Sequence, residues 1–161
     1  MIEYRKGNLL DAQSGVIVHG CNMLGVMGAG VAKAIKDKYP ECYTRYKLSL
    51  ESKDKPKLGD IIWYYHPWNE YKSAKRDYLW IANALTQETC GGDPTVRYVN
   101  YVAVANVFRI ISNSNIEYNY FSDVHFPKIG AGLANGDWNI IEQIINDSDP
   151  HDKYRKVCWV L

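Results

Sequence analysis

Short apolar runs alternate along the chain with longer segments in which apolar residues recur at every third or fourth position. The short runs are rich in β-branched or aromatic residues and predict strands at 16–18, 61–65, 78–85, 124–126 and 157–161. The longer segments predict amphipathic helices that start near Val31, Pro40, Asp93 and Trp138. Strands separated by helices of this size predict an α/β sandwich with a largely parallel sheet.

Proline, glycine and asparagine mark the boundaries of the predicted elements. Pro40 ends the first helix and can open the second, because its fixed φ suits the first helical position. Asp93 followed by Pro94 is typical of a helix start, and Asn113 and Asn115 mark the end of that helix. Polar or Gly- and Pro-containing segments predict loops at 51–59, 66–75, where a hairpin is the alternative, and 86–93. No repeat or low-complexity linker is visible, so we expect one domain over residues 1–161.

Composition and charge narrow the classes of partner. Of the 161 residues 47% are hydrophobic, which is enough for one compact core. Lys and Arg number 19 against 18 Asp and Glu, so there is no electrostatic case for nucleic acid or an anionic membrane as the main partner. The four cysteines form no Cys-x-x-Cys pair, and with no apolar leader or membrane-length run we expect free thiols in the cytoplasm.

The glycine-rich segment 19–32 leaves a predicted strand and enters a predicted helix. Glycines allow close approach of the backbone to a ligand, and the helix N-terminus offers free N–H groups and a positive dipole end. These features predict a phosphate or diphosphate cradle, with a tight crossover turn as the alternative. Val31-Ala32 does not fit a P-loop, and Lys33 stands where a Rossmann fingerprint has its third glycine.

A second glycine-rich segment, 127–138, also follows a predicted strand and precedes a predicted helix. In a parallel sheet both loops emerge at the carboxyl ends of strands, where ligands bind. Two such loops that face each other can hold one diphosphate from both sides.

These segments resemble the macro domain family, through His19-Gly20-Cys21-Asn22, Gly28-Ala29-Gly30-Val31-Ala32 and Pro127-Lys128-Ile129-Gly130-Ala131-Gly132-Leu133. Gly7-Asn8-Leu9-Leu10 resembles the family's Gly-Asp-Leu/Ile opening, and the similarity covers nearly the whole chain. Within the family it is greatest to yeast-type ADP-ribose-1″-phosphate phosphatases, their phage relatives and the terminal ADP-ribose protein glycohydrolase. The resemblance implies a three-layer α/β/α fold with a mixed, largely parallel central sheet and a cleft for ADP-ribose or ADP-ribose-1″-phosphate.

The resemblance assigns ligand contacts to both loops and to the two ends of the chain. Asn22 is expected beside the distal ribose. Asn8 replaces the acid that contacts the adenine amino group, and its amide oxygen can still accept that hydrogen bond. Trp159 stands where an aromatic often contacts adenine, with core packing as the alternative. The full predicted set is Asn8, Leu9, Gly20, Cys21, Asn22, Met27, Gly28, Ala29, Gly30, Val31, Ile129, Gly130, Ala131, Gly132, Leu133 and Trp159.

The resemblance also separates two activities. The glycohydrolase uses a lysine and an aspartate where this chain has Gln87 and Ala134, which can form no Schiff base and supply no acid or base. The phosphatases use a histidine in the first loop and an aspartate in the second, matched here by His19 and Asp137. This implies a phosphomonoester hydrolase acting on ADP-ribose-1″-phosphate. A non-catalytic nucleotide-binding module and an ADP-ribosyl hydrolase (deacylase) are the alternatives.

The chemistry of these two residues leaves several roles open. With an ordinary pKa of about 6.5, His19 can protonate the leaving oxygen or attack phosphorus, and Asp137 can orient it or activate water. Asp137 is also a candidate helix N-cap, His19 a candidate structural histidine, and His125 a weaker catalytic candidate. The acidic run 147–152 lacks the pattern of a calcium loop. We therefore expect no metal at this run. We also expect no cofactor and a monomer.

Overall fold

The computed structural model describes residues 1–66, 78–118 and 122–161; most of the predicted connection 66–75 lies outside these ranges. Its strands form one sheet in the order β1-β6-β5-β2-β4-β3. The strands are β1 (Ile2–Lys6), β2 (Gly15–Asn22), β3 (Ile61–His66), β4 (Leu79–Gln87), β5 (Asp123–Phe126) and β6 (Arg155–Val160). Neighbouring strands are parallel except β3 and β4, which are antiparallel. The predicted mixed, largely parallel sheet is confirmed.

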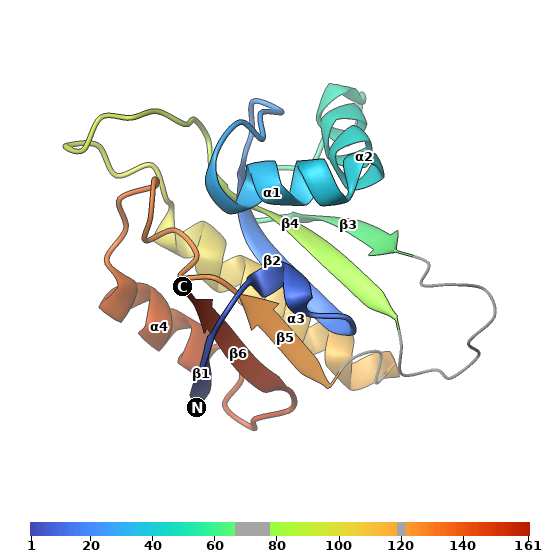
Figure 1. Cartoon of the computed structure of the whole chain (residues 1–161), viewed down its shortest axis with the longest axis vertical. Coiled ribbons are helices and arrows are strands. Elements are labelled where there is room, and N and C mark those ends of the chain that lie inside the picture. Colours follow the sequence, from blue (N-terminus) through green and yellow to red (C-terminus); the bar gives the residue numbers. More distant parts are fainter. Residues whose placement is uncertain (67–77, 119–121) are drawn as a thin grey trace.

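Helices cover both faces of this sheet (Figure 1). They are α1 (Gly30–Lys38), α2 (Pro40–Glu51), α3 (Tyr101–Tyr118) and α4 (Trp138–Asp147), and a 3₁₀ turn, η1 (Leu9–Asp11), follows β1. Because side chains alternate along a strand, Val16 and Val18 of β2 pack with α3 and α4. Ile17 packs on the other face with Ile35 of α1 and Cys42 of α2. These two cores give the three layers, α/β/α.

The helix predicted to start at Asp93 begins instead at Tyr101, so that prediction was wrong. The Asp93 carboxylate accepts hydrogen bonds from the N–H and hydroxyl of Thr95, which closes a local turn. The N–H groups of Tyr98 and Val99 bond to the carbonyl of residue 134. A long-range backbone contact therefore gives these N–H groups a partner outside a helix. A helix cap is supplied later, where the amide oxygen of Asn100 accepts from the N–H of Ala103.

The predicted end of this helix at Asn113 and Asn115 was also wrong, because α3 continues to Tyr118. Its Val107 and Phe108 are fully buried against the sheet. Asparagine lowers helix propensity by less than about 1 kcal/mol, and the packing of this apolar face outweighs it. Propensity alone therefore placed the boundary too early.

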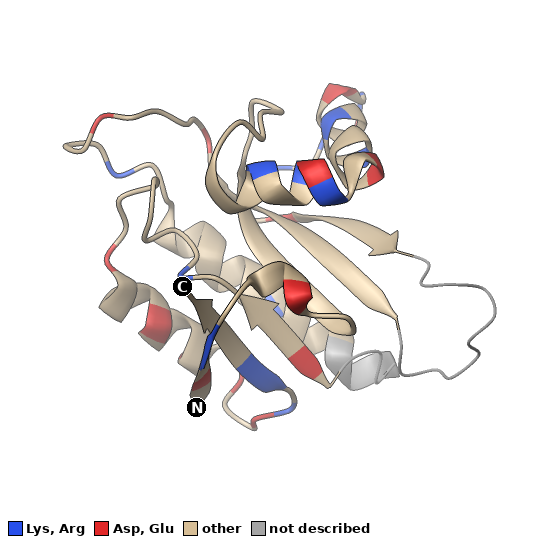
Figure 2. Ribbon diagram, in the orientation of Figure 1, with Lys and Arg blue, Asp and Glu red and all other residues tan. Residues whose placement is uncertain are grey.

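Two strand boundaries bear on the site. β1 was not predicted, because only Ile2 of its five residues is buried and the strand lies at the sheet edge beside β6. β2 extends beyond Val18 to Asn22, so His19 and Asn22 lie on a strand rather than on the loop that follows it. No helix in the described ranges has the length and hydrophobicity of a membrane span. Figure 2 shows basic and acidic residues intermixed on α1 and α2.

Candidate nucleotide-binding site

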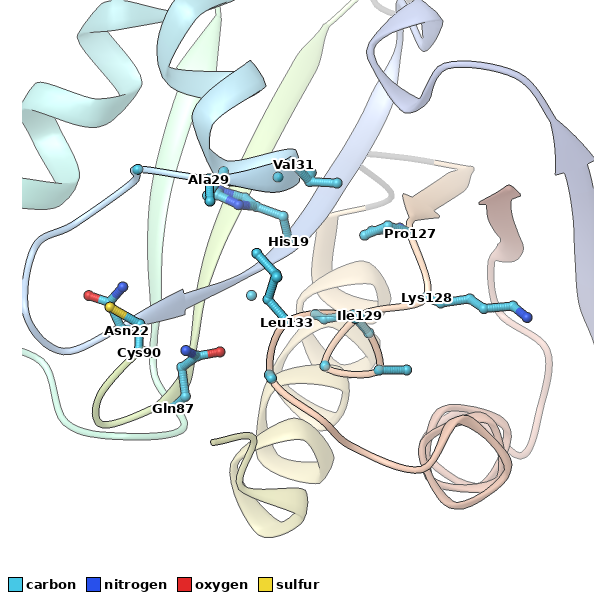
Figure 3. Close-up of a pocket in the computed structure, with 18 of the residues that line it drawn as sticks. His19, Asn22, Ala29, Val31, Gln87, Cys90, Pro127, Lys128, Ile129 and Leu133 are labelled. Carbon is cyan, nitrogen blue, oxygen red and sulfur yellow. The ribbon is translucent and has the colours of Figure 1, made fainter. Parts of the chain in front are cut away.

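A cavity of about 630 Å³ lies at the carboxyl ends of β2 and β5, between the two glycine-rich loops (Figure 3). The first loop joins β2 to α1, the second joins β5 to α4, and the segment that follows β4 closes one end. Its lining is His19, Gly20, Asn22, Val26, Gly28, Ala29, Gly30, Val31, Ala32, Gln87, Cys90, Gly91, Pro127, Lys128, Ile129, Gly130, Ala131, Gly132, Leu133 and Ala134. The structure thus brings both predicted loops to one cavity.

Asn22, the last residue of β2, holds the first loop in shape through its side-chain hydrogen bonds. Its amide oxygen accepts hydrogen bonds from the N–H groups of Leu24 at 3.0 Å and Val26 at 3.3 Å, and its amide nitrogen donates to the Val26 carbonyl at 2.8 Å. The hydroxyl of Tyr46 on α2 donates to the Asn22 backbone carbonyl at 2.7 Å. The side chain of Asn22 therefore shapes the loop, and its amide oxygen also accepts from the Tyr46 hydroxyl at 3.0 Å.

The helices that follow the two glycine-rich loops differ at their N-termini. Ala29 is the N-cap of α1 and makes no side-chain capping hydrogen bond. At α4, the carboxylate of Asp137 accepts from the Asn139 N–H at 2.8 Å and fills that role. Uncapped N–H groups at the positive end of a helix are a favourable place for an anion. The N-terminus of α1, which lines the cavity, is therefore the one suited to an anion.

The second loop is held close to the core and reaches across to the first. Gly130 has φ +75°, and its carbonyl accepts from the N–H of Gly136 at 2.8 Å. Leu133 is 65% exposed, and its Cδ1 lies 3.7 Å from the point where a Cβ on Gly30 would be. Figure 3 shows Leu133 projecting from the second loop between the two loops. The side chain of Leu133 therefore connects the second loop to the start of α1 at the cavity.

His19 forms part of the cavity lining although only 1% of its surface is exposed. Its Nε2 lies 2.6 Å from the amide oxygen of Asn83 on β4. Burial lowers the pKa of His19 to about 4, while the hydrogen bond to Asn83 acts in the opposite direction. At neutral pH His19 is therefore an uncharged imidazole.

The lining is poor in charge. Within the described residues it contains no Asp or Glu, and its one Lys or Arg is Lys128. Figure 3 shows the Lys128 side chain directed away from the other labelled residues. Without carboxylates to repel it, an anion can use the backbone N–H groups and the α1 dipole. The cavity is therefore suited to a phosphate-bearing ligand.

Relatives with this sequence pattern include a phage protein and two kinds of ADP-ribose enzyme. The chain is 30% identical to an uncharacterized 17.5 kDa protein of Enterobacteria phage T4, over 91% of this chain and 88% of that protein. It is 26% identical to an ADP-ribose 1″-phosphate phosphatase of Aspergillus oryzae, over 89% and 87%. It is 27% identical to a DNA ADP-ribosyl glycohydrolase of Mycobacterium tuberculosis, over 89% of this chain but only 37% of that longer protein. No family model matches the sequence.

Solved structures share the fold of this chain. The macrodomain of Mycobacterium tuberculosis DarG matches with a TM-score of 0.77 at 23% identity, over 100% of this chain and 98% of that one. Thermosipho africanus DarTG, solved in complex with ADP-ribose, matches with a TM-score of 0.72 at 16% identity, over 96% of this chain and 40% of that one. The chain belongs to the macrodomain family.

Six residues predicted to act or bind in this macrodomain do not line the cavity. Asp137 caps α4, and its catalytic role stays a prediction that the geometry does not connect to His19. Asn8 caps η1 through a 2.9 Å bond to the Leu10 N–H. The indole of Trp159 donates to Nδ1 of His125 at 3.2 Å, and neither residue lines the cavity. The other three are buried apolar residues, Leu9, Cys21 and Met27.

Residues that the predicted ligand set lacks also line the macrodomain's cavity. They are Val26, Ala32, Gln87, Cys90, Gly91, Pro127, Lys128 and Ala134. Cys90 and Gly91 belong to the segment after β4, the parallel neighbour of β2. The rule that ligands bind at the carboxyl ends of parallel strands, applied to this third strand, was the signal that could have found them. Gln87 and Ala134, which stand at the glycohydrolase positions, both lie in the cavity.

Proposed function

We propose that this macrodomain binds an ADP-ribose-type nucleotide between its two glycine-rich loops and hydrolyses the terminal phosphate of ADP-ribose-1″-phosphate. The observation that carries the proposal is the position of His19 in a cavity that an uncapped helix N-terminus lines and to which the described part of the chain contributes no carboxylate. The products are ADP-ribose and inorganic phosphate. Similarity to the Aspergillus oryzae phosphatase over 87% of that protein's length supports this choice.

The cavity separates two tasks. The uncapped N–H groups of α1 and the backbone of the second loop stabilise negative charge on the diphosphate and on the transferred phosphoryl group. His19 is the imidazole in the lining, and its unprotonated nitrogen can accept a proton from water. Because it is uncharged in the folded protein, it serves as an acceptor of a proton and not as an acid.

Two other functions are the alternatives. A module that binds ADP-ribose without turnover is favoured by the absence of Asp137 from the cavity lining and by the burial of His19. An ADP-ribosyl hydrolase is favoured by similarity to the mycobacterial glycohydrolase and opposed by Gln87 and Ala134. Neither side chain can act as a nucleophile, acid or base in that chemistry.

The test is release of phosphate from ADP-ribose-1″-phosphate by the purified protein, with ADP-ribose affinity measured by calorimetry on the same samples. We expect release from the wild type and its loss in His19→Asn, with ADP-ribose affinity retained. Asp137→Asn keeps an N-cap oxygen and is expected to retain release. Tight ADP-ribose binding without release by the wild type would establish the binding module instead. Release of ADP-ribose from ADP-ribosylated DNA or protein would establish the glycohydrolase.

A further inference from the structure

A buried polar network lies directly beneath the cavity. His19 on β2 and Asn83 on β4 are register partners in the parallel pair, and Nε2 of the imidazole is 2.6 Å from the amide oxygen of Asn83. Asn83 has no exposed surface. A polar pair buried in this way is stable only if each donor meets an acceptor. The network therefore fixes which atom carries the hydrogen.

The orientation of the Asn83 amide follows from its other neighbour. Its nitrogen donates to the backbone carbonyl of Ile62 on β3 at 3.0 Å. A carbonyl oxygen can only accept, so the nitrogen must face Ile62 and the oxygen must face His19. The Cys42 sulfur on α2 lies 3.3 Å from that nitrogen. Because the Asn83 oxygen can only accept as well, Nε2 of His19 is the protonated nitrogen.

The second ring nitrogen, Nδ1, then carries a lone pair. The Cys21 sulfur lies 3.8 Å from Nδ1 and 3.6 Å from Nε2. A partner placed along the Nδ1 lone pair would be clearly closer to Nδ1 than to Nε2. The thiol contact therefore leaves the lone pair unused in the described part of the chain. In Figure 3 the His19 ring projects toward Ala29, where the first loop enters α1.

We propose that Asn83 is the positioning residue of this site: it holds His19 as the neutral Nε2–H tautomer, so that Nδ1 is the atom that accepts a proton from the attacking water. This inference rests on the proposed phosphatase function. As the water oxygen bonds to phosphorus, one of its protons passes to Nδ1. The bond from phosphorus to the anomeric oxygen breaks, that oxygen keeps the electron pair and takes a proton from solvent, and the imidazolium returns its proton to solvent.

The electrostatic surroundings of His19 agree with this geometry. The titratable groups that face it are Cys21 on its own strand and Cys42 on α2, and burial raises the pKa of both thiols. Both are therefore neutral between pH 4 and 8. Lys128 lines the same cavity but is directed away. No neighbouring charge then holds His19 in the protonated form, and the amide of Asn83 supplies orientation without charge.

The direct measurement is the tautomer of His19 in the full chain labelled with ¹⁵N-histidine. Two-bond ¹H–¹⁵N correlation spectra distinguish Nε2–H, Nδ1–H and imidazolium forms, and the His19→Asn variant assigns the resonances. We expect the Nε2–H form from pH 8 to pH 5. An Nδ1–H form, or an imidazolium at pH 7, would overturn the proposal. Neither result depends on whether the protein releases phosphate.

The functional arm replaces the amide by a carboxylate of the same shape. In Asn83→Asp the partner of His19 is charged, which raises a histidine pKa by about 1–3 units. The pH below which kcat declines should rise by the same number of units, because protonated His19 cannot accept a proton. At pH 5, phosphate release by Asn83→Asp should therefore be roughly tenfold slower than release by the wild type. Asn106→Asp is the matched control, because Asn106 is a half-buried α3 amide bonded to the Gly59 carbonyl at 3.0 Å, away from the cavity.

The remaining results either support or overturn the positioning role of Asn83. A pH profile and a His19 titration in Asn83→Asp that overlay those of Asn106→Asp would make Asn83 purely structural and overturn the proposal. If the wild type releases no phosphate, the proposed function fails, and the tautomer and its titration still decide the role of Asn83. If Asn83→Asp does not fold, the second variant is Cys42→Ala, which removes the thiol that contacts the amide nitrogen of Asn83. It should keep the wild-type tautomer, and a changed tautomer would overturn the assignment.

Discussion

The conformation and packing of the second loop predict the stability cost of adding a methyl group at Gly130. Two effects contribute to that cost. The φ of Gly130, +75°, lies in the left-handed region, which an L-residue with a Cβ adopts at a cost of about 1–2 kcal/mol. A Cβ at this position would lie 2.7 Å from Cγ2 of Val99 and 3.2 Å from Cδ1 of Ile141. Both neighbours are buried, and crowding of a packed core costs typically about 1–3 kcal/mol. Gly130→Ala should therefore destabilise the protein by about 2–5 kcal/mol.

The assay is urea unfolding followed by tryptophan fluorescence and far-UV circular dichroism on the same samples. With an m-value of about 2 kcal/mol/M, the midpoint should fall by about 1–2.5 M. Gly132→Ala is the control in the same loop, because a Cβ there has no neighbour within 4 Å and its φ is not positive. A Gly130→Ala midpoint within about 0.3 M of the wild type, or an equal loss in Gly132→Ala, would refute the reasoning.

Three further predictions concern single side chains. Asp137→Ala should lower stability by roughly 1 kcal/mol through loss of the α4 cap, whereas Asp137→Asn should not, as urea midpoints will show. Because the pKa of His19 is about 4 when folded and about 6.5 when unfolded, the unfolded chain binds the proton first. Stability should fall as pH drops from 6.5 to 4, by roughly 3 kcal/mol, and less steeply in His19→Asn. In the wild type the Lys156 ammonium lies 2.9 Å from the buried carboxylate of Asp149. Lys156→Met removes this partner of the carboxylate. It should cost about 3–5 kcal/mol, with part regained on adding Asp149→Asn.

Much of the fold could be predicted because its signals are local. The strand around Val16 is buried and apolar on both faces, and Pro40 separates two helices by its own geometry. The errors occur where a distant partner decides the conformation. The segment before α3 donates hydrogen bonds to the carbonyl of residue 134 rather than within a helix, and β1 lies at the sheet edge, paired to β6. No local pattern reports either contact.

The site divides in the same way. The sequence by itself determined that two glycine-rich loops follow strands and precede helices, because glycine content and strand–helix order are properties of contiguous residues. Only the tertiary structure decided which side chains meet there. It left Asp137, an N-cap candidate from the sequence, outside the cavity lining, added Cys90 from the segment after β4, and set Asn83 against His19. His19 and Asn83 are 64 positions apart, and they become neighbours only through the register of β2 with β4. Burial of that pair, which sets the protonation of His19, is likewise a property of the packed layers and not of the residues in sequence.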